Sequence, residues 1–209
     1  MSHPGVARSA GYAEAMTAST GFGARLARSP LAVWVAFVLV HIWLGMLNLY
    51  GPGFPFGDVT FVYEPWAQDA LTNNHWVGIN SPWVYPIVAI VPMLLSAMFG
   101  MPQYPGTWLC MVMVLNAVAF GVLTGWGRSR ARLGAAWWWV AFLVLLGPIA
   151  LGRIDSVSVP LAMVGVIVIV GYPRIATVLL TLATWIKVWP AALLLAAVVT
   201  SHQRKRIVA

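Results

Sequence analysis

The chain consists largely of long apolar runs separated by short polar and basic stretches. Several runs approach or reach the roughly 20 residues that a helix needs to cross a bilayer. They lack the alternation of apolar and polar residues that a membrane β-barrel would show. The pattern therefore predicts an all-α polytopic membrane protein with about six transmembrane helices. The candidate membrane segments are 31–50, 83–99, 107–126, 133–151, 156–170 and 175–200.

One of these segments, 83–99, is unsuited to a plain spanning helix because it is rich in proline. Pro82, Pro86 and Pro92 lie at its start and within it, and proline breaks the helical hydrogen-bond ladder. We expect a juxtamembrane or re-entrant helix there, on the outer side. Residues 51–106 would then form one long outer loop with short helices of its own.

Segment 175–200 is interrupted by Lys187 and Pro190. We expect two short helices, one on each side of 187–190. The first, 175–186, would be about 18 Å long at 1.5 Å per residue, which is short of the roughly 30 Å hydrocarbon core. A helix that ends at this depth must meet other protein or a wet cavity, so the break predicts a cavity.

Composition agrees with the membrane class. Hydrophobic residues make up 61% of the 209 residues and charged residues 8%, whereas an ordinary soluble domain is roughly 25% charged. The first apolar run is too long for a signal-peptide core, so we expect it to be retained as a helix. The single cysteine, Cys110, lies within an apolar run, which argues against a disulfide framework or a thiolate metal site.

The net charge of +7 would suit nucleic acid, but its distribution argues against such a partner. Basic residues gather at the ends of the apolar segments, as orientation signals do. If segment 83–99 does not cross the membrane and segment 175–200 forms two helices, every basic cluster falls on the cytoplasmic side. We therefore expect a polar cytoplasmic tail (1–30), a membrane domain (31–209) and both termini in the cytoplasm. The clusters are Arg25/Arg28, Arg128/Arg130/Arg132, Arg174 and Arg204/Lys205/Arg206.

Carboxylates are scarce. Only five side chains are acidic, and three of them, Asp58, Glu64 and Asp69, lie within a dozen residues after the first apolar run. Such a cluster at a membrane boundary is a candidate for acid–base or cation chemistry. Asp58 is either the N-cap of a short helix or a general base, while solvated surface is favoured for Glu64 and Asp69.

Three more charged residues, Arg153, Asp155 and Lys187, fall on the outer side in the same topology. Asp155 would cap the helix that follows it or pair with Arg153, unless it has a functional role. Lysine between apolar segments is costly unless it snorkels or finds an anion, and we favour an anionic partner for Lys187. Carboxylates and cations at one outer cavity would suit a phosphate-bearing substrate and a proton acceptor.

Other signals are weaker. The sequence has no Walker loop, no dinucleotide fingerprint and no His/Cys metal spacing, so we expect neither metal nor cofactor. It shows no internal repeat of the kind found in paired transporter halves. His41 and Asn116 lie within spanning runs and are expected to form interhelical hydrogen bonds.

Three motifs occur in a suggestive order. They are Gly57-Asp58-Val59 with Tyr63 and Trp66, then Trp83-Val84-Tyr85-Pro86, and then Gly152-Arg153-Ile154-Asp155 followed by Lys187-Val188-Trp189-Pro190. Together they resemble the integral-membrane glycosyltransferases of the C-type fold, above all the actinobacterial mannosyltransferases that use polyprenol-phosphate-mannose. Ile87 stands where that family has a second proline, and Arg153 and Asp155 lie where Gly-Gln-x-Asn is common.

The resemblance implies a role for each matching position. Asp58 would be the catalytic base, which deprotonates an acceptor hydroxyl on the outer face of the membrane. That hydroxyl would attack the anomeric carbon of a lipid-phosphate sugar and invert its configuration. Lys187 and Arg153 would hold the phosphate of the donor. The supporting residues would be Asp155, Tyr85 and Glu64.

The same resemblance implies the partners and the location. The donor would be polyprenol-phosphate-mannose, the acceptor an envelope glycolipid or glycan, and the location the plasma membrane. Family members usually continue with further membrane helices, so we expect an amino-terminal fragment, a truncated reading frame or a degenerate paralogue. Two rival hypotheses are a small transporter, with Asp58 and Asp155 as cation sites, and a non-catalytic membrane subunit.

Overall fold

The computed structural model describes residues 27–200, and every regular element within that range is helical. One isolated bridge, between Val77 and Ser81, is the extended pairing found there. The predicted all-α class is therefore confirmed for the described residues. Predicted features that lie outside them are the polar tail up to residue 26, with Glu14 and Arg25, and the basic cluster Arg204, Lys205 and Arg206.

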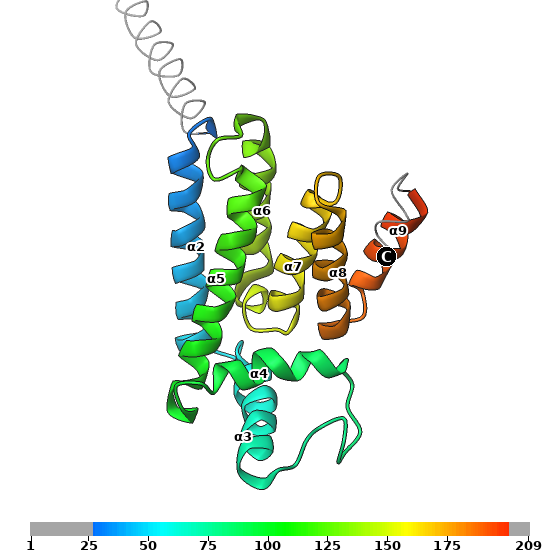
Figure 1. Ribbon diagram of the computed structural model, residues 1–209. Coiled ribbons are helices and arrows are strands. Elements are labelled where there is room, and N and C mark those ends of the chain that lie inside the picture. Colours follow the sequence, from blue (N-terminus) through cyan, green and yellow to red (C-terminus); the bar gives the residue numbers. More distant parts are fainter. Residues whose placement is uncertain (1–26, 201–209) are drawn as a thin grey trace, which may run out of the picture.

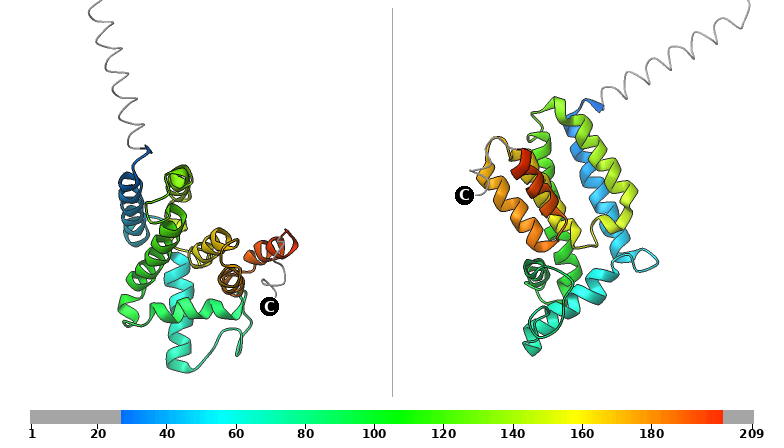
Figure 2. Two further views of the ribbon diagram at one scale, coloured as in Figure 1. Left: turned by 45° about the horizontal axis from the view of Figure 1, so that its top comes forward. Right: turned by 90° about the vertical axis from the view of Figure 1, so that its right-hand side faces the viewer.

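Within residues 27–200, three helices are long and apolar enough to cross a membrane. They are α2 (Pro30–Tyr50) and the stretches Met101–Thr124 and Arg130–Ala150, which contain α5 (Tyr104–Thr124) and α6 (Leu133–Leu146). The three pack against one another (Figure 1; Figure 2, right). Between α2 and α5, the rings of Phe37 and Phe120 stack with their centroids 4.3 Å apart. Length and composition thus support a membrane protein.

Three shorter apolar helices follow, α7 (Asp155–Val168), α8 (Pro173–Ile186) and α9 (Pro190–Thr200). Of the six predicted spanning helices, three therefore reach spanning length. The 14 residues of α7 or α8 extend about 21 Å at 1.5 Å per residue. These two helices pack closely at Gly165, where a Cβ atom would lie 2.9 Å from Cγ of Leu180.

The predicted break within segment 175–200 is confirmed. α8 ends at Ile186, Lys187 has an extended backbone with φ −147° and ψ 136°, and α9 begins at Pro190. Proline suits the first position of a helix because its missing N–H has no intrahelical partner there. The break fixes Lys187 outside both helices.

Segment 83–99 forms no long helix, as its prolines predict. Extended backbone at Pro86 precedes a 3₁₀ turn (Ile87–Ala89) and the seven-residue α4 (Ile90–Ser96). These ten residues extend at most about 20 Å at the 1.5–2.0 Å rise of the two helix types. α4 runs across one end of the bundle, close to α3 (Glu64–Asn73) (Figure 1).

His41 and Asn116 are buried, but their hydrogen bonds do not connect helices. Nδ1 of His41 lies 2.9 Å from the carbonyl oxygen of Phe37. Nδ2 of Asn116 donates to the carbonyl oxygen of Val112 at 3.0 Å. Each partner lies one turn earlier on the same helix, so the prediction of interhelical hydrogen bonds is wrong.

Candidate functional site

Three consecutive residues, Arg153, Ile154 and Asp155, form the centre of the candidate site. Arg153 and Ile154 lie between the 3₁₀ turn that follows α6 and the start of α7, and Asp155 is the first residue of α7, at the end of the bundle where α3 and α4 lie (Figure 1). Gly152 lets the turn approach the end of α2, because a Cβ atom there would be 2.8 Å from Oδ1 of Asn48. This approach brings the turn next to the loop that contains Asp58.

Asp58 and Arg153 form an ion pair between Oδ2 of the carboxylate and a guanidinium nitrogen. The pair lies at the edge of the protein, since 25% of the Asp58 side chain and 46% of the Arg153 side chain are exposed. Asp58 directly precedes a π-helical turn (Val59–Tyr63), yet its side chain forms no capping hydrogen bond. The N-cap interpretation of Asp58 is therefore wrong.

Asp155 is paired with Lys187 rather than with Arg153. Nζ of Lys187 lies 3.5 Å from Oδ2 of Asp155, and Nε1 of Trp189 donates to Oδ1 at 3.1 Å. Lys187 also lies over the ring of Tyr85, 4.8 Å from its centroid, which is within the range of a cation–π interaction. The anion expected beside Lys187 is thus a carboxylate of this chain.

Tyr63 connects Asp58 to the turn at Ile154, although no role was predicted for Tyr63 from the sequence. Its side chain is fully buried. The hydroxyl accepts from the N–H of Ile154 at 3.1 Å and donates to Oδ2 of Asp58 over a long 3.4 Å. Burial, reinforced by Tyr85, raises the pKa of Tyr63 well above its usual range, so the phenol keeps its proton.

Of the predicted supporting residues Tyr85 and Glu64, only Tyr85 contacts the charged residues of the site. The ring of Tyr85 lies beneath Lys187 and 6.3 Å from that of Tyr63, between centroids. Glu64 stands apart: within residues 27–200, no ion pair joins its carboxylate to another side chain. Partial burial raises the pKa of Glu64. The Asp69 side chain is 40% exposed, and its Oδ2 lies 3.3 Å from Nδ1 of His75. This position agrees with the predicted solvated surface.

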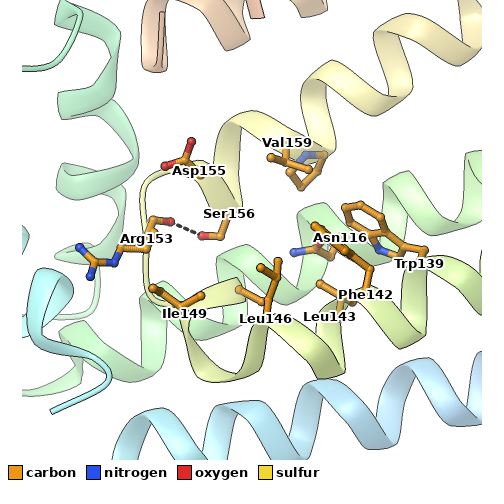
Figure 3. A pocket seen from close by; sticks show the side chains of 12 residues that line it. Asn116, Trp139, Phe142, Leu143, Leu146, Ile149, Arg153, Asp155, Ser156 and Val159 are labelled. Carbon is orange, nitrogen blue, oxygen red and sulfur yellow. Dashed lines mark hydrogen bonds between the residues drawn. The ribbon is translucent and has the colours of Figure 1, made fainter. Parts of the chain in front are cut away.

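An apolar cavity of about 240 Å³ lies beside the turn, between α5, α6 and α7. Figure 3 shows that the guanidinium of Arg153 points away from the side chains of Asn116 and Trp139, which line the cavity. Nε1 of Trp139 is buried and has no hydrogen-bond partner among the described residues. A cavity was expected at the break between α8 and α9, whereas this one lies on the other side of α7.

The arrangement combines two cations and two carboxylates whose formal charges cancel. Such a site can bind an anion through its cations and accept a proton on a carboxylate. Comparison with known proteins gave no matching family model, no similar curated protein and no similar solved structure.

Proposed function

We propose that this chain is an inverting glycosyltransferase of the C-type fold. It transfers a mannosyl or other glycosyl residue from a polyprenol-phosphate sugar to an envelope glycolipid or glycan, on the outer face of the plasma membrane. One observation carries the proposal: Asp58, Arg153, Asp155 and Lys187 meet at one end of the bundle, beside an apolar cavity. A lipid-linked phosphate requires both a cationic and an apolar site.

The phosphate of the donor binds to Arg153 and Lys187. A guanidinium carries five N–H donors and an ammonium three, so Arg153 can hold Asp58 and a phosphate oxygen at the same time. About half of the Arg153 side chain and a third of the Lys187 side chain are exposed. Both cations are therefore accessible to a ligand without unfolding of the site.

The cavity between α5, α6 and α7 accommodates the start of the lipid tail. At about 240 Å³, it is larger than the engineered apolar cavity of about 150 Å³ that binds benzene. It has room for the first isoprene units, which would reach it past Arg153 and Asp155 at its rim, because the guanidinium of Arg153 points away from the cavity. The remaining tail would lie in the bilayer along the apolar helices.

Asp58 is the base in the proposed reaction. The acceptor oxygen forms a bond to the anomeric carbon, the bond from that carbon to the phosphate oxygen breaks, and the acceptor proton moves to Asp58. The lipid phosphate leaves as a monoester with one more negative charge than the diester. Arg153 and Lys187 stabilise that additional charge as it develops.

The proposed orientation places the site outside and both termini in the cytoplasm. The basic residues Arg128, Arg130 and Arg132 lie in the α5–α6 connection, and Arg174 lies at the start of α8. Both connections are at the end of the bundle opposite α3 and α4 (Figure 1). Basic residues favour the cytoplasmic side, which supports this orientation. The short helices α7, α8 and α9 complete the six proposed spans.

The test is transfer of labelled mannose from polyprenol-phosphate-mannose, in membranes that contain the wild-type chain, Asp58→Asn or Asp69→Asn. We expect loss of transfer in Asp58→Asn and wild-type transfer in Asp69→Asn, which is exposed on α3 and serves as the matched control. Normal turnover by Asp58→Asn would remove Asp58 from the mechanism. No transfer by any inserted protein would favour a transporter or a non-catalytic subunit.

A further inference from the structure

A single π-helical turn places Tyr63 beside Asp58. In this turn, the N–H of Glu64 bonds to the carbonyl oxygen of Val59, five residues earlier. In an α-helix, five residues rotate the chain by about 500°, which would leave residues 58 and 63 about 140° apart. The wider turn allows their side chains to meet, and π turns of this kind recur at functional sites.

Pro65 gives a local reason for the wide turn. Proline has no N–H, so residue 65 cannot donate to the carbonyl oxygen of Phe61, its α-helical partner. The α-helical ladder is therefore already incomplete at the junction between Val59–Tyr63 and α3. A change to the i→i+5 pattern at this point costs less than it would within an uninterrupted helix.

The ring of Tyr63 is buried among other aromatic rings. Its centroid lies 5.2 Å from that of Trp108 and 6.3 Å from that of Trp66, and none of its side chain is exposed. The N–H of Ile154 occupies the acceptor side of the hydroxyl. The hydroxyl can then donate to Oδ2 of Asp58, 3.4 Å away, and Tyr85 is a second polar neighbour of the same hydroxyl.

We infer that Tyr63 is a positioning residue for Asp58, which it holds so that Oδ1 is the oxygen that receives the acceptor proton. The inference rests on the proposed function, and it adds which oxygen of Asp58 receives the proton. Oδ2 already accepts hydrogen bonds from both Arg153 and Tyr63. Oδ1 has no hydrogen-bond partner in the described part of the chain, and the side chain is partly exposed.

The test compares Tyr63→Phe with Tyr104→Phe. Tyr104 is also fully buried, but its hydroxyl has no hydrogen-bond partner among the described residues, so this variant controls for the loss of a buried phenol. Hydrogen bonds to charged groups are stronger than neutral ones, and this one is long. We therefore expect kcat to fall about tenfold in Tyr63→Phe, with KM for the donor unchanged.

Equal kcat values for Tyr63→Phe and Tyr104→Phe, in a preparation whose wild type requires Asp58, would overturn the inference while the proposed function survives. A rise in KM with unchanged kcat would also overturn it, because that pattern would indicate a role in donor binding. Thermal unfolding of each purified variant in detergent establishes that the compared proteins are folded.

A second readout does not depend on turnover. A water-soluble carbodiimide couples glycine ethyl ester to accessible carboxylates, and mass spectrometry measures the extent at Asp58. We expect labelling of Asp58 to rise several-fold in Tyr63→Phe and to stay at the wild-type level in Tyr104→Phe. If the wild type transfers no sugar, the proposed function fails and labelling alone decides the positioning role. Equal labelling in all three proteins would refute it.

Discussion

The ion pair between Asp58 and Arg153 can be tested by a double-mutant cycle with near-isosteric neutral side chains. The variants are Asp58→Asn, Arg153→Gln and the double variant. Each removes one charge and keeps most of the volume of the side chain. The quantity of interest is the coupling energy, which is the difference between the effect of the double variant and the sum of the single effects.

The structure sets the expected size of this coupling. Two unit charges 4 Å apart interact by about 4 kcal/mol at an effective dielectric constant of 20, and solvent reduces this value when the groups are exposed. Fully exposed pairs give about 0.2–1 kcal/mol, whereas breaking a buried pair costs about 3–5 kcal/mol. With exposures of 25% and 46%, we expect a coupling of about 1–2 kcal/mol, above the value for fully exposed pairs and below the cost of breaking a buried pair.

The two single variants should also differ. Arg153→Gln leaves the less exposed partner, Asp58, without its cation, whereas Asp58→Asn leaves a half-exposed guanidinium that can turn towards water. We therefore expect Arg153→Gln to be the more destabilising of the two. An unpaired charge costs more where less solvent reaches it.

The assay is thermal unfolding of the purified proteins in detergent. For soluble chains of 150–250 residues, 1 kcal/mol corresponds to about 2–4 °C, so the coupling should appear as about 2–8 °C of non-additivity. The control cycle uses Asp69→Asn and His75→Gln, an exposed pair at 3.3 Å, whose coupling should stay below about 1 kcal/mol. Additive effects in the Asp58 cycle would show that the two charges do not interact, and the reasoning would be refuted.

Two further predictions concern packing and orientation. Gly165→Ala should destabilise the protein by about 1 kcal/mol, because overpacking against Leu180 outweighs the gain in helix propensity. The control Gly134→Ala, where a Cβ atom meets nothing within 4 Å, should be neutral or stabilising. Equal unfolding midpoints for the two variants would contradict the packing prediction. In a Cys110→Ala background, a membrane-impermeant maleimide should label Thr72→Cys in intact cells and Ser129→Cys only after permeabilisation, and the opposite result would invert the proposed orientation.

The helices were predictable from the sequence because their causes are local. Apolar runs of about 20 residues indicate long membrane helices, and the described part of the chain contains three such helices. Pro190 marks the start of α9, and the prolines near residue 86 exclude a long helix in 83–99. Each of these conclusions needs only the residues within a few positions of the feature.

The partners of charged and polar side chains were not predictable in the same way. Asp155 lies two positions from Arg153, so local proximity favoured that pair, but the close approach at Gly152 brings Arg153 to Asp58 instead. Asn116 was expected to reach another helix, although a carbonyl of its own helix lies within reach. Tyr63 was quoted only as part of a motif, and its contact with Asp58 was not predicted because the α-helical period would place the two side chains apart. The π turn changes that period.

The turn at Arg153, Ile154 and Asp155 also sets the order in which the site is completed during synthesis. At about 5–20 residues per second, Asp58 precedes Arg153, 95 residues later, by about 5–20 s. Asp155 precedes Trp189 by a further 34 residues, or about 2–7 s. Because residues emerge in the order in which they are synthesised, Asp58 and Arg153 can pair before Lys187, the cation of Asp155, has emerged. The site is therefore complete only after the chain has been synthesised through the break between α8 and α9, which contains Lys187.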